Sequence, residues 1–182
     1  MMYIILIIVV VLAIIYISIY NGLQRAKVNT EESWSQIDVQ LKRRNDLIPN
    51  LLETVKGYAK HEQETFSKVV ELRNQLTSGS NSRQETIDVS NQLTDSLKSV
   101  FALAEAYPDL KANQNFLSLQ EELANTENKI AYSRQLYNST VRVYNQKLLV
   151  FPSNIIAGIH HFTKMEFLAI PEAEKEVPKV KF

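Results

Sequence analysis

The chain has 182 residues, with 20 basic side chains, 20 acidic side chains and no cysteine. A balanced charge and a pI near 6.8 argue against a nucleic-acid-binding protein, which normally carries a basic excess. The absence of cysteine excludes disulfides, thiolate metal sites and a thiol nucleophile. The length suits one domain of ordinary size with its own core.

The first twenty residues differ in composition from all that follow. Residues 1–20 are apolar except for Ser18, and every charged residue lies after them. A helix of about 20 residues spans about 30 Å, the thickness of a bilayer hydrocarbon core. A cleaved signal peptide would need basic residues before a shorter apolar stretch and small residues at the cleavage site. We therefore predict an uncleaved transmembrane anchor over residues 1–20, with Tyr16 and Tyr20 at the exit interface.

Basic residues close to the span indicate which side of the membrane holds the rest of the chain. Arg25 and Lys27 follow the span directly, and Lys42, Arg43 and Arg44 come later. Cytoplasmic flanks of membrane spans are enriched in Lys and Arg. We predict a single-pass protein of the cell membrane with its amino terminus outside and its domain in the cytoplasm.

Long helices are predicted throughout the part that follows the span. Glycine and proline are scarce there, and apolar residues recur at spacings of three and four. The first helix runs to Ile48 and has no breaker between it and the span, so that the two can be one helix. A second helix follows Pro49 and ends near Leu76. A polar linker covers 77–84, and a third helix stops at Tyr107, before Pro108.

The fourth predicted helix carries the strongest pattern. Residues 113–151 contain neither proline nor glycine. Its large apolar or aromatic residues repeat every seven positions, which is typical of a helix packed lengthwise against others. These residues are Phe116, Leu123, Ile130, Tyr137, Tyr144 and Phe151.

The connection between the first two helices has two interpretations. Asn45 and Asp46 can form a tight turn with Asp46 as the amino-terminal cap, which puts Pro49 in the first helical turn. Alternatively, Pro49 only kinks one continuous helix. We favour the reversal, which gives an all-α fold: a single transmembrane helix followed by an elongated antiparallel four-helix bundle.

The expected domain organisation follows from these elements. Residues 21–151 form the helical bundle, and residues 152–170 form an apolar segment that packs on the bundle or against the membrane surface. Residues 171–182 are rich in charge and contain proline, and we expect them to be disordered.

Three blocks of sequence resemble the LemA family. They are WSQIDVQLKRRNDLIPNLLETVKGYAKHE, AEAYPDLKANQNFLSLQEELANTENKIAYSRQLYN and VYNQKLLVFPSN, which begin at Trp34, Ala104 and Val143. With the amino-terminal anchor they cover most of the chain. The resemblance implies a bacterial single-pass membrane protein with an α-helical domain, and a family without an agreed activity.

Several charged residues fall at positions that should face the bundle core. The heptad pattern places Glu127 and Arg134 there, and the stripes of the first two helices place Arg44 and Glu62 there. Buried charges are costly unless they are paired. We interpret Arg44, Glu62, Glu127 and Arg134 as a polar layer of ion pairs that fixes the helix register. A ligand or ion pocket built from the same residues is the alternative.

Motifs for catalysis or cofactor binding do not occur in the sequence. Carboxylate-bridged metal sites in helical bundles use Glu-x-x-His on two helices, and this spacing is absent. His160 and His161 are adjacent, so that they cannot chelate from one helix face. Neither Gly-x-Ser-x-Gly nor a glycine-rich phosphate loop is present. We predict no enzymatic activity, no catalytic residues, no metal and no cofactor.

These observations favour a membrane-anchored helical bundle that acts by binding or scaffolding. Its expected partners are the lipid bilayer, through residues 1–20, and another membrane or envelope protein. A ligand- or ion-sensing bundle that uses the polar layer is the alternative function. Self-association stays open at this point.

Overall fold

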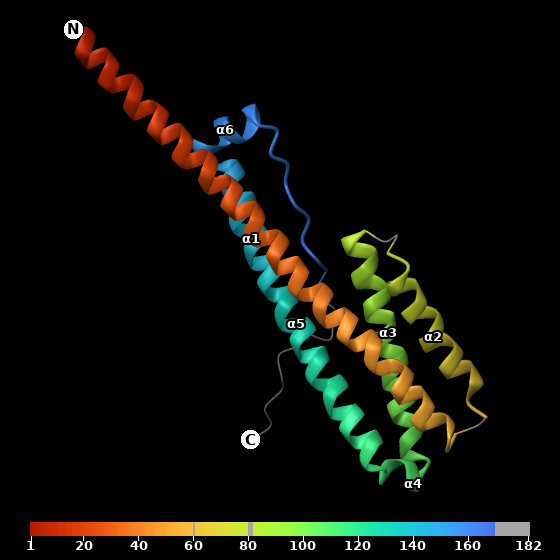
Figure 1. The fold of residues 1–182 in the computed structure, drawn as a ribbon. Helices are drawn as coiled ribbons and strands as arrows, with labels where there is room; N and C mark the ends of the chain where they lie inside the picture. Colours follow the sequence, from red (N-terminus) through yellow and green to blue (C-terminus); the bar gives the residue numbers. More distant parts are fainter. Residues whose placement is uncertain (60, 80–81, 170–182) are drawn as a thin grey trace, which may run out of the picture. The chain divides into compact units, whose positions relative to one another are not determined.

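A computed structural model describes residues 1–59, 61–79 and 82–169 of the chain (Figure 1). The predicted all-α class is confirmed, since the described residues form helices and no strand. The helices are α1 (Met2–Lys56), α2 (Gln63–Thr77), α3 (Arg83–Glu105), α4 (Pro108–Lys111), α5 (Gln114–Leu149) and α6 (Ser153–Ile159). The disorder predicted for 171–182 lies outside the described residues.

The chain divides into two compact units. The first, here called the anchor unit, combines Met1–Ile37 with Ser133–Phe167. The second, here called the bundle unit, contains Asp38–Tyr132 and, among the described residues after α6, Leu168 and Ala169. Helices α1 and α5 are each divided between the two units, after Ile37 and after Tyr132.

Helix α1 begins in the predicted membrane anchor and continues without a break to Lys56. It contains an uncharged apolar stretch long enough to cross a membrane, and none of that stretch is buried in the protein. The prediction of one helix through span and first bundle helix is confirmed. The predicted reversal at Asn45 and Asp46 is wrong, because both residues lie inside α1, and so does Pro49. The chain leaves α1 only after Lys56.

The continuity of α1 through Pro49 has a physical explanation in α2. Proline has no backbone N–H, so that the carbonyl oxygen of Asn45, four residues earlier, loses its helical hydrogen bond. The Arg73 side chain replaces the missing donor, since its Nε donates to this oxygen at 3.0 Å. A tertiary contact thus supplies the hydrogen bond that Pro49 cannot donate, at the place where the sequence predicted a turn.

The core of the bundle unit is built from all four long helices. Its fully buried side chains interdigitate between α1, α2, α3 and α5, with one contribution from α4. Phe101 on α3 meets Phe116 on α5 edge to face, at 6.2 Å between ring centroids. The arrangement confirms the predicted four-helix packing. The buried residues include Ile48, Leu51, Val55, Phe66, Val69, Leu72, Leu93, Leu97, Val100, Leu110, Phe116 and Leu123.

The heptad pattern of α5 is confirmed over most of its length. Phe116, Leu123, Ile130, Tyr137 and Tyr144 are all at most 2% exposed. The last predicted position is wrong. Phe151 is 78% exposed, because α5 ends at Leu149 and the chain turns at Pro152 before α6.

Helix α3 begins with a capping box. The Glu85 backbone N–H donates to Ser82 Oγ at 3.3 Å, and the Ser82 backbone N–H donates to Glu85 Oε2 at 2.7 Å. Two orphan donors of the first turn are therefore satisfied. Hydrogen bonding to Ser82 lowers the pKa of the Glu85 carboxyl. The backbone of Ser82 makes the larger contribution and its side chain the smaller one.

Arg73→Met should destabilise the bundle by about 1–3 kcal/mol, because it leaves the Asn45 carbonyl without a donor in a partly buried place. Pro49→Ala restores an N–H at residue 49 and should remove most of this cost. Thermal and urea unfolding of the two single variants and the double variant measure the coupling. Equal costs of Arg73→Met in both backgrounds would contradict the compensation.

Candidate functional site

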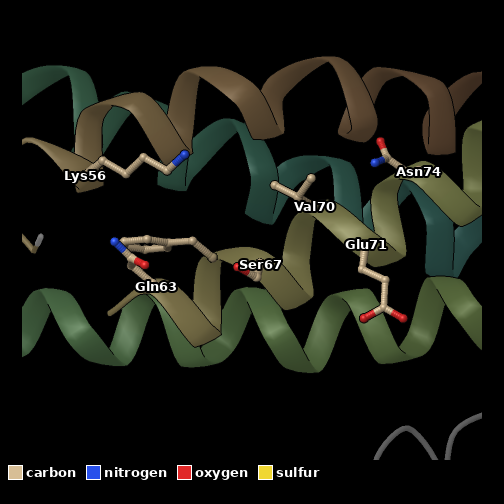
Figure 2. Close-up of a pocket in the computed structure, with 7 residues that line it drawn as sticks. Lys56, Gln63, Ser67, Val70, Glu71 and Asn74 are labelled. Carbon is tan, nitrogen blue, oxygen red and sulfur yellow. The ribbon is translucent and has the colours of Figure 1, made fainter. Parts of the chain in front are cut away.

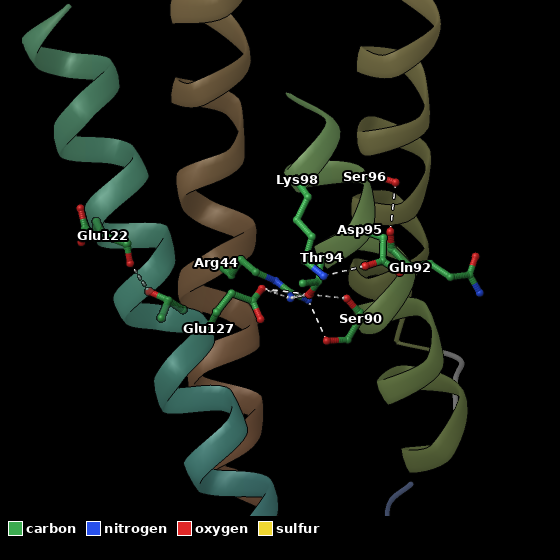
Figure 3. Close-up of polar contacts among 10 residues, drawn as sticks. Arg44, Ser90, Gln92, Thr94, Asp95, Ser96, Lys98, Glu122 and Glu127 are labelled. Carbon is green, nitrogen blue, oxygen red and sulfur yellow. Dashed lines mark hydrogen bonds and ion pairs between the residues drawn. The ribbon is translucent and has the colours of Figure 1, made fainter. Parts of the chain in front are cut away.

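The bundle unit contains a buried polar network centred on Arg44 of α1. The side chain of Arg44 is completely buried. Its Nη1 donates to Glu127 Oε1 of α5 at 2.6 Å and to Thr94 Oγ1 of α3 at 3.0 Å. Its Nη2 donates to Ser90 Oγ of α3 at 2.9 Å. In Figure 3 these side chains from three helices converge on the guanidinium.

Thr94 connects the two ends of this network. Its hydroxyl oxygen lies 3.0 Å from Glu127 Oε1 and 3.1 Å from the Ser90 carbonyl oxygen, while it also accepts from Arg44. A hydroxyl has one hydrogen, so that it donates to one of these oxygens at a time. Glu127 is 26% exposed at its side chain, which leaves the network one edge open to water. The Nε of Arg44 has no protein acceptor among the described residues.

Glu62 and Arg134 are the other two residues of the predicted polar layer. Glu62 occupies the position before α2, is half-buried and makes no capping hydrogen bond with its side chain. Arg134 belongs to the anchor unit, where it is 5% exposed. The structure therefore brings Arg44 and Glu127 of the predicted layer together.

Ser90 and Thr94 belong to the network although sequence reasoning did not select them. A signal exists in the sequence, since Ser90 is four residues before Thr94 and lies in register with the apolar stripe of Leu93, Leu97 and Val100. Two small hydroxyl residues on a core-facing stripe indicate a polar group opposite them. Ser90 is fully buried.

A second polar arrangement holds the segment after α6 in the anchor unit. The Tyr144 hydroxyl donates to the Thr163 carbonyl at 3.0 Å, and burial raises its pKa. Asn145 donates from Nδ2 to the Met165 carbonyl at 2.8 Å and accepts from the Met165 N–H at 3.0 Å. The side chain of Asn145 thus pairs with both backbone polar groups of Met165, as a residue of a neighbouring strand would. Tyr137 contacts the same segment through the Glu166 carbonyl, at 3.4 Å.

These contacts explain how residues 162–167 are placed without regular secondary structure. Tyr137 and Tyr144 belong to the predicted heptad pattern, and because both side chains are buried their hydroxyls need partners. The partners are backbone carbonyls of the apolar carboxy-terminal segment. Helix α6 and the residues after it up to Phe167 belong to the anchor unit.

An open groove lies on the bundle unit, between the end of α1 and α2 (Figure 2). Its volume is about 830 Å³. Phe66 and the partly exposed Val70 supply its apolar lining. Figure 2 shows Lys56 and Gln63 toward one end, Glu71 and Asn74 toward the other, and Ser67 between them. The two ends therefore carry opposite charges.

The described residues contain no cluster of three or more His, Asp or Glu side chains that could hold a metal ion. The Arg44 network offers one carboxylate, two hydroxyls and one guanidinium, and all are engaged with one another. This arrangement can fix helix register and can orient Glu127 toward its open edge.

Comparison with known proteins places the chain in a family. Residues 33–182 match the LemA family. The chain belongs to the LemA family. It is 27% identical over 144 residues to Protein LemA of Metamycoplasma hominis, an alignment that covers 79% of this chain and 65% of that relative.

Two magnetosome proteins are more distant relatives of this LemA family member. Magnetosome protein MamQ 2 of Paramagnetospirillum magneticum is 21% identical, and Magnetosome protein MamQ of Magnetospirillum gryphiswaldense is 19% identical. Each alignment covers 81% of this chain and 64% of the relative. The chain thus spans about two thirds of the length of the relatives that it matches. Their names describe no enzymatic activity. The apolar amino-terminal helix, which is long enough to cross a membrane, indicates a membrane protein.

Arg44→Met should destabilise the protein by about 3–5 kcal/mol, because Glu127 then keeps its charge without its cation. Arg44→Met combined with Glu127→Met should cost clearly less than the sum of the two single changes. Urea unfolding of the four proteins followed by circular dichroism measures this coupling. The control cycle uses Arg43 and Glu122, which join the same two helices at 2.7 Å but are 48% and 40% exposed. Its coupling should be below about 1 kcal/mol, and equal coupling in both cycles would contradict a role of burial.

Proposed function

We propose that this protein is a membrane-anchored helical scaffold that binds another membrane or envelope protein through the groove between α1 and α2. The groove carries the proposal, because it combines apolar lining with opposite charges at its two ends. Binding surfaces of proteins typically place apolar side chains centrally and polar ones at the rim. The protein performs no chemistry of its own in this proposal.

The partner element that best suits the groove is an amphipathic helix. Such a helix presents apolar side chains at spacings of three and four, which suits an open apolar groove. An acidic residue near Lys56 and a basic residue near Glu71 would match the charges at the ends. These charges set the direction of the bound helix. In the free protein the carboxylate of Glu71 forms an exposed ion pair within α2, with 3.2 Å between Glu71 Oε2 and Lys68 Nζ.

The alternative, a ligand-sensing bundle built on the polar layer, has less support. Both Nη atoms of Arg44 already have protein partners, and Glu127 accepts from Arg44 and lies within hydrogen-bond distance of Thr94. A ligand would have to displace several short bonds within a packed core. The groove between α1 and α2 needs no such rearrangement.

Photocrosslinking in intact membranes tests the groove directly. A photoreactive amino acid at Ser67 of the full-length chain should give one discrete protein adduct. A second change, Val70→Glu, places a charge on the apolar lining and should reduce that adduct at least about fivefold, the effect of about 1 kcal/mol. Val39→Glu is the matched control, since Val39 is also exposed on the bundle unit but does not line the groove.

Two results would contradict the groove as the binding surface. One is an adduct from Ser67 that persists unchanged in Val70→Glu. The other is equal loss of the adduct in Val70→Glu and Val39→Glu. Mass spectrometry of the adduct separates a different protein from a second copy of this chain.

The proposed topology places the bundle in the cytoplasm with the amino terminus outside. Arg25 and Lys27 directly after the span support this orientation. The chain has no cysteine, so Ser96→Cys on α3 gives a single thiol. A membrane-impermeant maleimide should label it only after cells are permeabilised. Labelling on intact cells would contradict this topology, because it would place the bundle outside the cell.

A further inference from the structure

The exit of α1 from the predicted membrane span is marked by contacts within the anchor unit. Side chains from Met2 to Ser18 are exposed, whereas Leu23 is 1% exposed. Near this change, the Tyr16 hydroxyl lies 2.7 Å from His160 Nε2, and the ring centroids of Tyr20 and His160 are 4.6 Å apart. A helix rises about 27 Å from residue 2 to Tyr20, close to the thickness of the hydrocarbon core. The start of protein packing therefore coincides with the membrane interface.

The end of α5 and helix α6 carry exposed apolar side chains beside this exit. Leu149, Phe151, Ile155 and Ile159 are between 54% and 78% exposed. The opposite side of α6 packs on α1, where Ile156 and Ala157 form a small core with Leu23. A short helix with apolar side chains on its outer face, next to a membrane span, suits immersion in the boundary between headgroups and acyl chains.

The charge around this exit differs from that of the whole chain. The chain is neutral, but residues 18–30 and 139–165 contain five basic residues and no Asp or Glu. The five are Arg25, Lys27, Arg142, Lys147 and Lys164. Basic side chains close to a span are attracted to anionic lipid surfaces.

A small pocket lies at the same level of the anchor unit. Its volume is about 190 Å³, below the about 300–1,000 Å³ of pockets for drug-sized ligands. Tyr20, Gln24 and Lys27 of α1 line one part, and His160 and His161 line another. None of the described residues that line it is acidic.

The position of the pocket depends on how the chain leaves α6. His161 has a φ of 53°, in the left-handed region, so that the chain turns back toward the side chains of α5. Asn145 and Tyr144 then hold Met165 and Thr163, which complete the wall. The polar lining is thus held in place by the packed segment rather than by a free loop.

We propose that this pocket binds the phosphate of an anionic phospholipid headgroup, whose acyl chains lie beside the exposed side chains of α6. The Lys27 ammonium, the Gln24 amide and the imidazole N–H groups are donors suited to phosphate oxygens. A lipid is the occupant that matches both the basic pocket and the adjacent apolar surface, which is continuous with the span. This site lies in the anchor unit and does not rest on the groove of the bundle unit.

Native mass spectrometry of the full-length protein in an uncharged detergent tests this site. Phosphatidylglycerol and phosphatidylcholine are added separately at equal concentration, with and without inorganic phosphate. Phosphatidylglycerol should be retained preferentially. Lys27→Gln should lower its retention about fivefold, whereas Lys27→Arg should largely keep it. Lys42→Gln is the control, because it removes the same charge from an exposed position of the bundle unit.

Three results would overturn the proposal. The first is equal retention of the two lipids by the unchanged protein. The second is the same loss in Lys42→Gln as in Lys27→Gln, with circular dichroism showing both variants folded. The third is displacement of phosphatidylglycerol by inorganic phosphate at equal concentration, which would make the pocket a site for free phosphate.

Discussion

Arg44 is a buried cation, and the bundle unit is arranged around the partners that it requires. An unpaired charge in a packed interior costs several kcal/mol, so that the guanidinium has to meet acceptors from neighbouring helices. Ser90 and Thr94 supply them from α3, and Glu127 supplies one from α5. The next residue, Asn45, needs a donor for its carbonyl, and Arg73 supplies it from α2. One turn of α1 is thereby joined by directional bonds to all three other long helices.

This arrangement accounts for the register of a core that is otherwise aliphatic. Leucine and valine side chains at heptad spacing pack with little change in energy when a helix slides by one repeat. A buried charge and an orphan carbonyl do not permit such a slide, because their partners lie at single positions. The apolar residues therefore supply most of the stabilisation, and the polar residues select one alignment of the helices.

The anchor unit applies the same principle to backbone groups. The segment after α6 has no helix or strand to satisfy its peptide groups, and side chains of α5 do so instead. Tyr144 and Asn145 are neighbours in sequence, yet both reach this segment. The fixed segment in turn forms one wall of the basic pocket beside the span. A structural device for satisfying carbonyls thus also creates a surface that a lipid headgroup can contact.

Both functional proposals assign binding to a surface of the protein and assign no catalysed reaction to it. The buried polar groups are engaged in fixing helices, and the described residues hold no set of metal ligands. Two surfaces are available to other molecules. One is the groove on the bundle unit, and the other is the basic pocket of the anchor unit with the exposed apolar side chains of α6 beside it. Both are consistent with a membrane protein of the LemA family whose relatives carry no enzymatic names.

The sequence by itself determined the helical class, the apolar anchor and the buried face of α5, because these follow from composition and from periodicity along one helix. It also indicated that Arg44 and Glu127 face inward. It could not decide the path of the chain at Pro49, since a proline with nearby Asn and Asp is locally compatible with a turn. Arg73, distant in sequence, decided it by restoring the missing hydrogen bond. Tertiary structure likewise decided which charges meet, because pairing across helices depends on their register. The same pattern selected Glu62 and Arg134, but Glu62 precedes α2 and Arg134 belongs to the anchor unit, because periodicity specifies a face of a helix and not the partner that this face meets.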